Sequence, residues 1–402
     1  MKFTDYPLSP LILSQLENMN FKKPTDIQFK AIPYILNGED VMAVAQTGTG
    51  KTAAFVIPII QRLLNKKAKG IRCVVLVPTR ELCEQIYLVF KEIGKKTPIK
   101  MINLIGGVDQ ENQISALQSN ANVLVTTPGR MFDLYSQGYI NFKSIETLVI
   151  DEADLMLTMG FQKDIEDILK IIPNKRQTLF FTATIDKKIK SLAYDVVRNA
   201  IRIQFSPKNP VSKNVFHTVM KVKMDDKRFF LENILNEYAK SSIIVFVRTK
   251  VRADRVQKAM DRVGLCVSII HGSIDQKERF SILSDFRNGH SKVLVTTDVT
   301  SRGIDLPNVD YVINYDIPDN PENYVHRCGR TGRGNNKGKA ISFCAENELE
   351  LLKSIEEYTG EEIIEYELSP NDYSVILDDT TDINSDWSKL LKDYKKENGD
   401  DW

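Results

Sequence analysis

Residues 45–52 have the types and the spacing of a loop that binds phosphate. They read AQTGTGKT, which is the phosphate-loop pattern with alanine in place of the usual first glycine. The loop follows the apolar run Val41–Ala45 and precedes a stretch with helical periodicity, so strand, loop and helix come in the required order. Glycines let backbone N–H groups and the helix N-terminus point at an anion. The residues expected to contact a nucleotide here are Gln46, Thr47, Gly48, Thr49, Gly50, Lys51 and Thr52.

Such a loop needs an acidic partner, and carboxylates follow the apolar run Leu148–Ile150. Asp151 is placed to hold a hydrated Mg²⁺ together with the Thr52 hydroxyl, while Lys51 should reach the β- and γ-phosphates. Glu152 can accept a proton from an attacking water or orient that water. The sequence DEAD is a weak signal alone, but it gains weight behind an apolar strand and downstream of a phosphate loop.

The elements that must position these residues are short apolar runs rich in valine and isoleucine, each followed by a helical pattern. Continuous runs predict strands that are buried on both faces, as in parallel sheets covered by helices. Such strands need crossover connections, so we predict two doubly wound α/β domains. The runs are Val41–Ala45, Cys73–Val77, Ile102–Ile105, Val123–Thr126, Leu148–Ile150, Thr178–Phe181, Ile243–Val247, Val267–Ile270, Val293–Thr296, Tyr311–Tyr315 and Lys339–Phe343.

The length of 402 residues also indicates more than one domain, because single cores rarely grow past about 250–300 residues. The polar segment after Phe205 contains Pro207 and Pro210 and lacks apolar periodicity, which is typical of a linker. We predict a first domain over residues 1–205, a linker over 206–214, a second domain over 215–369 and an acidic tail over 370–402.

Charge is balanced over the whole chain but not along it. The chain has 54 basic and 53 acidic residues, which gives a net charge of +1. Residues 1–205 carry 26 basic and 20 acidic side chains, residues 206–345 carry 23 and 15, and residues 346–402 carry 5 and 18. Two basic segments therefore precede an acidic end, and a partner that carries phosphates is compatible with the first two.

Several classes of protein are disfavoured by composition. The five cysteines form no CxxC pair and there are only four histidines, so no structural zinc site can be identified from spacing. Cysteines that act as small core residues fit a reduced, cytoplasmic setting. No run of about 18 or more apolar residues is present, so no membrane span is expected.

The order of further motifs resembles that of the DEAD-box RNA helicases of helicase superfamily two, over about residues 3–360. The resemblance implies two tandem RecA-like P-loop domains, each a mainly parallel sheet covered by helices. It also implies that ATP and Mg²⁺ are bound and that RNA is the partner. The matching segments are Phe21 with 24–28, 45–52, 78–82, 106–107, 127–130, 151–154, 182–184, 245–249, 271–272 with 276–279, 296–298 with 302–305, and 326–333.

The resemblance adds residues to the nucleotide site. The Gln28 amide can pair with the adenine edge through a donor and an acceptor, which would select ATP over GTP. Phe21 could stack on the base or belong to the core. Arg327 and Arg330 have the planar forks that an arginine finger requires, and they lie in the other half of the chain from Lys51, so two lobes would have to close on the nucleotide. The remaining implied residues are Thr25, Gly303 and Asp305 for the nucleotide, and Asp154, Thr182, Thr184 and His326 for coupling ATP to RNA.

For RNA, the resemblance implies a single strand held across both lobes by its sugar-phosphate backbone. Backbone contacts position a strand without reading its sequence, and contacts to the 2′-hydroxyl distinguish RNA from DNA. The implied RNA-binding residues are Pro78, Thr79, Arg80, Gly106, Gly107, Thr127, Pro128, Gly129, Arg130, Arg248, Gly272, Arg279 and Thr296.

The sequence departs from the family pattern at three positions. Asn20 stands where glycine is usual, but asparagine also tolerates left-handed backbone. Thr182 replaces serine and keeps the hydroxyl, so coupling should survive. Cys328 stands where many relatives carry an aliphatic residue, and we expect it to pack as an apolar side chain.

The tail has helical apolar spacing at Trp387, Leu390, Leu391 and Tyr394, with Ser385 as a possible cap. It could fold back on the second domain, dock a protein partner or be disordered. The core itself is expected to be monomeric.

The favoured function is an ATP-dependent RNA helicase that separates RNA duplexes locally or remodels RNA–protein complexes. An ATP-gated RNA clamp within a larger assembly is the first alternative, although Glu152 and Arg330 favour hydrolysis. A DNA-acting superfamily-two translocase is the second, although DEAD and Gln28 favour RNA.

Overall fold

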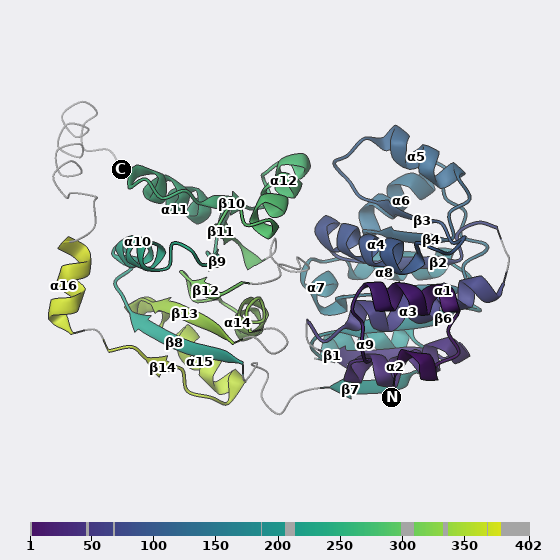
Figure 1. Ribbon diagram of the computed structural model, residues 1–402, viewed down its shortest axis with the longest axis horizontal. Coiled ribbons are helices and arrows are strands. Elements are labelled where there is room, and N and C mark those ends of the chain that lie inside the picture. Colours follow the sequence, from purple (N-terminus) through teal and green to yellow (C-terminus); the bar gives the residue numbers. More distant parts are fainter. Residues whose placement is uncertain are drawn as a thin grey trace. The chain divides into compact units, whose positions relative to one another are not determined.

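The computed structural model describes residues 2–45, 48–66, 69–185, 187–205, 214–298, 309–332, 337–367 and 369–378. The chain divides into two compact units, each built around one parallel sheet (Figure 1). Residues 206–213 of the predicted linker and residues 379–402 of the predicted tail, including Trp387, lie outside the described residues. The domain boundaries drawn from the sequence stay a prediction.

The first unit contains a seven-stranded sheet with the order β3-β4-β2-β5-β6-β1-β7, and every neighbouring pair is parallel. Because each strand is reached by a crossover, helices cover both faces. The strands are β1 (Val41–Ala45), β2 (Cys73–Leu76), β3 (Met101–Leu104), β4 (Val123–Thr126), β5 (Thr147–Ile150), β6 (Gln177–Thr182) and β7 (Ile201–Phe205).

Two hydrophobic cores lie on the two faces of this sheet. Phe181 belongs to the core that includes Phe55 and Phe90, whereas its neighbour Phe180 belongs to the core that includes Met131 and Ile165. This alternation explains why the strands read as continuous apolar runs. The helices are η1 (Phe3–Asp5), α1 (Pro10–Asn18), α2 (Asp26–Asn37), α3 (Lys51–Asn65), α4 (Arg80–Gly94), α5 (Gln110–Gln118), α6 (Pro128–Ser136), α7 (Ala153–Thr158), α8 (Gln162–Ile171) and α9 (Lys187–Val196).

The second unit repeats the architecture, with the parallel strand order β10-β11-β9-β12-β13-β8-β14. Its strands are β8 (Val215–Lys221), β9 (Ile243–Phe246), β10 (Ser268–Ile270), β11 (Val293–Thr296), β12 (Tyr311–Asn314), β13 (Gly338–Cys344) and β14 (Ile364–Glu365). Its helices are α10 (Lys227–Glu237), α11 (Lys250–Arg262), α12 (Gln276–Arg287), α14 (Pro321–Cys328), η2 (Glu346–Glu348), α15 (Leu349–Thr359) and α16 (Pro370–Asp378).

The predicted fold class is confirmed, and each predicted apolar run overlaps a strand. Three strands that the sequence did not predict are β7, β8 and β14. Strands β7 and β14 are at sheet edges and β8 lies next to β14, so many of their side chains are exposed or half-buried. A criterion based on continuous apolar runs selects strands buried on both faces and therefore misses these three.

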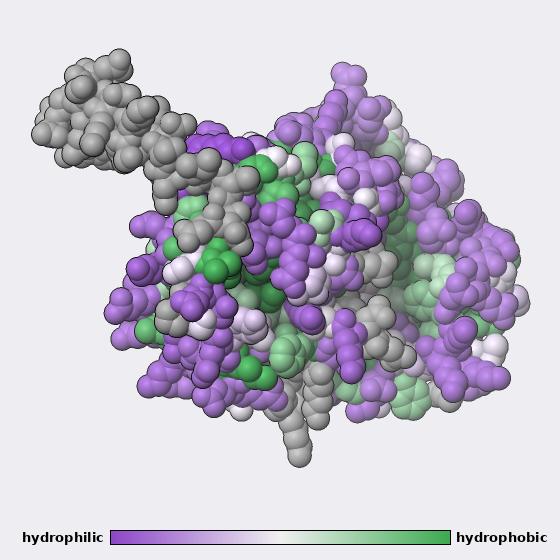
Figure 2. All heavy atoms as spheres, turned by 60° about the vertical axis from the view of Figure 1, so that its left-hand side comes forward, coloured by the Kyte–Doolittle hydropathy of each residue, from purple (hydrophilic) through white to green (hydrophobic). Residues whose placement is uncertain are grey.

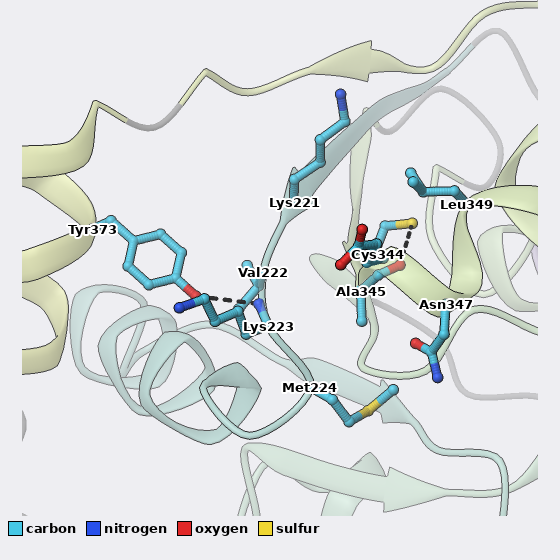
Figure 3. Close-up of a pocket in the computed structure, with 10 residues that line it drawn as sticks. Lys221, Val222, Lys223, Met224, Cys344, Ala345, Asn347, Leu349 and Tyr373 are labelled. Carbon is cyan, nitrogen blue, oxygen red and sulfur yellow. Dashed lines mark hydrogen bonds between the residues drawn. The ribbon is translucent and has the colours of Figure 1, made fainter.

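Helix α16 packs on α10 through Tyr373, beside a cavity of about 720 Å³. The Tyr373 hydroxyl donates to Asp226 Oδ2 at 2.7 Å and accepts from the Lys223 N–H at 3.1 Å, and its ring lies 4.9 Å from that of Phe230. The cavity opens at the carboxyl ends of β8 and β13 (Figure 3). The lining residues are Lys221, Val222, Lys223, Met224, Cys344, Ala345, Glu346, Asn347, Leu349 and Tyr373.

No helix within the described ranges is both long and apolar enough to cross a membrane. On the face drawn in Figure 2, hydrophilic side chains predominate and hydrophobic ones form small separate groups.

Acidification is expected to weaken the second unit through His217 on β8. The His217 Nδ1 atom lies 2.9 Å from the hydroxyl of the buried Tyr324, while Nε2 is buried without a partner in the described part of the chain. Burial lowers the pKa of His217 to about 4 from an ordinary value of 6.5. Between these pH values the unfolded chain binds a proton that the folded unit does not, so stability falls as pH decreases, by about 3 kcal/mol in all.

This pH dependence can be measured by hydrogen exchange of β8 and α14 peptides from pH 7.5 to 4.5. In His217→Gln, protection should depend less on pH over this range. His290, which is exposed, supplies the matched control in His290→Gln. Equal pH dependence in the parent and in His217→Gln would contradict the assignment.

Candidate nucleotide-binding and RNA-binding sites

Sheet order sorts the candidate residues of the first unit into two groups. The carboxyl ends of parallel strands meet at one edge of a sheet, which is where ligands bind in open α/β folds. Strands β5, β6 and β1 are neighbours, and they lead into Asp151, Thr182 and Lys51. Strands β3, β4 and β2 are also neighbours, and they lead into the predicted RNA-binding segments 106–107, 127–130 and 78–80.

The phosphate loop connects β1 to α3, and the first residue of α3 is the buried Lys51. Gly48 and Gly50 have φ values of +81° and +91°, a conformation that glycine adopts without a Cβ clash. Lys51 begins α3 and is only 7% exposed, and its Nζ atom has no hydrogen-bond partner in the described part of the chain. Burial of an unpaired ammonium is costly, so this position suits an anionic ligand. Gln46 and Thr47 lie outside the described residues.

Gln28 is tied to the phosphate loop. Its Oε1 atom accepts from the Thr25 N–H at 3.0 Å, and its Nε2 atom donates to the Gly50 carbonyl at 3.2 Å. A Cβ atom on Gly50 would lie 2.6 Å from Gln28 Nε2, so glycine is required for this approach. Phe21 is half-buried and its ring lies 6.2 Å from that of Phe3. The adenine contacts of Gln28 and Phe21 stay predictions.

The acidic pair follows β5. Burial raises the pKa of Asp151, while the positive charge of Lys51 opposes that rise. Asp151 Oδ1 accepts from the Glu152 N–H at 3.0 Å. Glu152 is buried and has a left-handed φ of +52°, which is uncommon for a residue other than glycine and is concentrated at functional sites.

Asp154 joins the end of β5 to the segment after β6. Its Oδ2 atom accepts from the Ala183 N–H at 3.2 Å and from the Thr184 hydroxyl at 3.4 Å, and the Thr182 hydroxyl donates to the Thr184 carbonyl at 2.8 Å. The structure thus brings together three of the four residues predicted to couple ATP to RNA. The fourth, His326, lies on α14 of the second unit.

The family comparisons decide the class of this chain. A model described as DEAD/DEAH box helicase matches residues 25–192, and one described as helicase conserved C-terminal domain matches residues 226–335. The chain is 39% identical over 363 residues to the ATP-dependent rRNA helicase RRP3 of Debaryomyces hansenii, which covers 90% of this chain and 76% of that protein. It belongs to the DEAD-box family of ATP-dependent RNA helicases.

Further relatives agree with this assignment. The DEAD-box ATP-dependent RNA helicase CshA of Geobacillus kaustophilus is 40% identical over 357 residues, covering 89% of this chain and 76% of that protein. Among solved structures, S. cerevisiae Dbp5 bound to RNA and ADP BeF3 matches with a TM-score of 0.85 and 33% identity, over 94% of this chain and 99% of that one. Mss116p bound to ssRNA and AMP-PNP matches with a TM-score of 0.84 and 28% identity, over 98% and 85%.

In this DEAD-box helicase, Arg80 and Arg130 of the first unit lie next to glycines that are also predicted to bind RNA. The Arg80 guanidinium packs on Gly106 and Gly107, where an added Cβ atom would overlap it. A Cβ atom on Gly129 would meet nothing within 4 Å, so a ligand can approach that backbone closely. Arg130 donates to Gln110 at 3.1 Å and pairs with Asp133, but its Nε and Nη2 atoms are buried without partners among the residues described. Of the other predicted residues, Thr79 caps α4, Thr127 occupies the cap position of α6 and Pro78 precedes Thr79.

In the second unit, predicted RNA-binding residues again follow neighbouring strands. Arg248 lies after β9, Gly272 after β10 and Thr296 at the end of β11, while Arg279 is on α12 in the stretch Asp275–Phe280 that belongs to the first unit. A Cβ atom on Gly272 would meet nothing within 4 Å, which leaves its backbone accessible. Thr296 is instead buried, and its hydroxyl donates to the Thr297 carbonyl at 3.3 Å.

Arg327 is held inside the second unit by carboxylate, carbonyl and amide oxygens. Its Nε and Nη2 atoms contact the two Asp298 carboxylate oxygens at 2.5 and 2.8 Å, and Nη1 donates to the Asp316 carbonyl at 2.7 Å and to Asn314 Oδ1 at 3.2 Å. Arg327 thus links the segment after β11 to α14, and its contact with nucleotide stays a prediction. Arg330 is also buried, and its Nε atom donates to the His326 carbonyl at 3.3 Å.

Asp298, in the matching segment 296–298, is a functional residue that the sequence pattern does not identify on its own. Its position shortly after the apolar run Val293–Thr296, together with the arginines of the later segment 326–333, is the sequence feature that could have indicated an ion pair. Gly303 and Asp305, which were predicted to contact the nucleotide, lie outside the described residues.

Two of the family departures behave as expected. Asn20 has a left-handed φ of +58°. Cys328 is buried, and burial raises the pKa of its thiol to about 12, as suits an apolar packing role.

Proposed function

We propose that this DEAD-box helicase uses ATP hydrolysis to separate short RNA duplexes locally or to remodel RNA–protein complexes. The observation that carries the proposal is the sheet order of the first unit, in which β1, β5 and β6 lead into the nucleotide candidates and β2, β3 and β4 lead into the RNA candidates. Both groups of residues thus stand on one edge of one rigid sheet. The bonds of Asp154 to residues 183–184 tie together the segments after β5 and β6, and the pairing of β5 with β2 joins the nucleotide group to the RNA group.

The nucleotide site has the chemistry that ATP requires. Lys51 would pair with the β- and γ-phosphates, which would satisfy its buried ammonium. Thr52 and Asp151 would hold Mg²⁺ through a hydroxyl and a carboxylate oxygen, which are the hard ligands this ion prefers. No group of three or more acidic, histidine or cysteine side chains among the residues described could hold a metal alone, so phosphate and water oxygens would complete the shell. When bound, Mg²⁺ neutralises phosphate charge.

Hydrolysis is assigned to Glu152 as the group that orients the attacking water and accepts its proton. Asp151 stays beside Lys51, whose charge opposes the rise in the Asp151 pKa that burial causes. Arg330 would stabilise charge on the transferred phosphoryl group once the two units close on ATP. Arg327 would hold the loop that carries Asp298 and α14 in register for that closure.

RNA would be bound by its backbone, with arginines pairing to phosphates and exposed glycine backbone allowing close approach. Cooperative binding of ATP and a single strand would favour the closed form, and bending of the strand in that form would separate a short duplex. We also propose that the core acts as a monomer in the cytoplasm and that residues 370–402 dock a protein partner or fold back on the second unit. The proposals on oligomeric state, location and the tail rest on the sequence alone.

Glu152→Gln is expected to lower RNA-stimulated ATP hydrolysis by about 100-fold or more while ATP and RNA still bind, because only proton acceptance is lost. The variant should remain on RNA in the presence of ATP, so crosslinking in cells should enrich RNA above the parent level. Glu166→Gln, an exposed site on α8, is the matched control and should behave as the parent. Failure to enrich any RNA would contradict the proposed function.

A strand-separation assay distinguishes a helicase from a clamp. The parent should separate a short duplex repeatedly with ATP and at most once per bound molecule with a non-hydrolysable analogue. Equal retention of RNA in both conditions, without separation, would indicate a clamp.

A further inference from the structure

Acidic groups surround Arg248, the arginine that follows β9. Its Nη2 atom donates to the Ile317 carbonyl at 2.8 Å and to Glu348 Oε1 at 3.1 Å, and its Nε atom lies 3.1 Å from Asp319 Oδ1. Its backbone N–H donates to Asp316 Oδ2 at 2.9 Å. An arginine proposed to contact RNA phosphate is therefore already paired with carboxylates.

The two carboxylates that pair with the guanidinium differ sharply in burial. Glu348 is 1% exposed and is fixed by three further hydrogen-bond donors, whereas the Asp319 side chain is 68% exposed. The Glu348 carboxylate accepts from Lys227 Nζ at 2.5 Å, from the Ala345 N–H at 3.1 Å and from the Ile317 N–H at 3.3 Å. Glu348 is thus a permanent anchor, because its removal would leave these donors unpaired.

The contact to Asp319 is the replaceable one. Exposed ion pairs are worth little, because water and salt screen them and two flexible side chains lose freedom. A phosphate oxygen is an equally good acceptor for a guanidinium nitrogen and can bind it in the same geometry as a carboxylate. In the same turn, Glu346 and Asn347 line the cavity beside α16, where Figure 3 shows Asn347, whereas Glu348 is buried.

We propose that Asp319 occupies the place of an RNA phosphate at Arg248 and is displaced when RNA binds. Glu348 keeps the guanidinium fixed during the exchange, and Asp319 lowers RNA affinity by competing for the Nε edge. This inference rests on the proposed function, because it takes Arg248 as an RNA contact. Asp319 is a positioning residue in this arrangement and does not itself touch RNA.

The test measures the affinity of the full-length protein for a single-stranded RNA, with a non-hydrolysable ATP analogue, at several salt concentrations. Asp319→Asn should bind RNA about two- to fivefold more tightly than the parent at low salt, because a competing exposed pair is lost. Asp261→Asn removes the same charge from an exposed site on α11 and should change affinity less. The difference between the two variants should shrink as salt rises.

The deciding comparison is made in a protein that lacks Arg248. In Arg248→Gln, Asp319→Asn should have no further effect on RNA affinity, because the competed group is absent. An equal gain from Asp319→Asn with and without Arg248 would overturn the inference, since it would reduce the effect to general charge. No gain from Asp319→Asn in a parent that binds RNA would also overturn it and would leave the proposed function intact. A parent that fails to bind RNA would overturn both.

Discussion

Lys51→Ala is expected to lower RNA-stimulated ATP hydrolysis by about 100- to 1,000-fold, because the variant loses a fixed cation that stabilises charge on the transferred phosphoryl group. The Nζ atom is buried at the start of α3, and no described residue accepts a hydrogen bond from it. Its expected partner is therefore the nucleotide. The rate is measured at saturating RNA over a range of ATP concentrations, and the loss should appear in both kcat and the apparent affinity for ATP.

Stability separates this role from a structural one. The Lys51 ammonium is buried without a hydrogen bond and has only the charge of Asp151 to offset its lost hydration, so the thermal unfolding midpoint of the ATP-free Lys51→Ala protein should stay close to that of the parent. Lys66→Ala, at the other end of α3, is the control, since Lys66 is exposed and pairs with Glu146 at 3.5 Å. Loss of stability in Lys51→Ala that parallels its loss of activity would mean that Lys51 supports the fold instead.

The nucleotide loop could be predicted from sequence because its information is local. Val41–Ala45, the two glycines and Lys51 lie within eleven residues, and each carries a physical requirement that shows in residue type. The central strands could be predicted for the same reason, since burial on both faces leaves an uninterrupted apolar run. Edge strand β7, with exposed Arg202 and Gln204, shows no such run.

The charge networks of the second unit could not be predicted, because their members are far apart along the chain. Lys227 and Glu348 are 121 residues apart, and Arg327 and Asp298 are 29 apart. A lysine or glutamate in a helical stretch ordinarily indicates a solvated surface. Only the fold shows that Lys227 and Glu348 are buried together and that Arg327 pairs with Asp298, while the contact of Arg327 with nucleotide stays a prediction.

The largest stability effect in the second unit is expected at the pair formed by Lys227 and Glu348. Lys227 is fully buried, and its Nζ atom lies 2.5 Å from Glu348 Oε2 and donates to the Tyr315 carbonyl at 2.8 Å. Burial lowers the pKa of Lys227, and the charge of Glu348 opposes this shift. Glu348→Gln should therefore destabilise the second unit by about 3–5 kcal/mol, because it leaves the buried ammonium with only the more distant Asp316 carboxylate, 3.9 Å away.

A second substitution tests whether the cost arises from the unpaired charge. Replacing both partners in the double variant Lys227→Met, Glu348→Gln removes the uncompensated ammonium, so part of the lost stability should return, with a favourable coupling energy in a double-mutant cycle. The free energy is measured by hydrogen exchange of α10 and β13 peptides. Glu365→Gln is the control, since Glu365 pairs with Lys221 at 2.7 Å but both side chains are exposed, and it should cause no measurable change. Equal effects at the buried and the exposed pair would mean that burial does not set the strength of these contacts, and the anchoring role given to Glu348 beside Arg248 would fall with it.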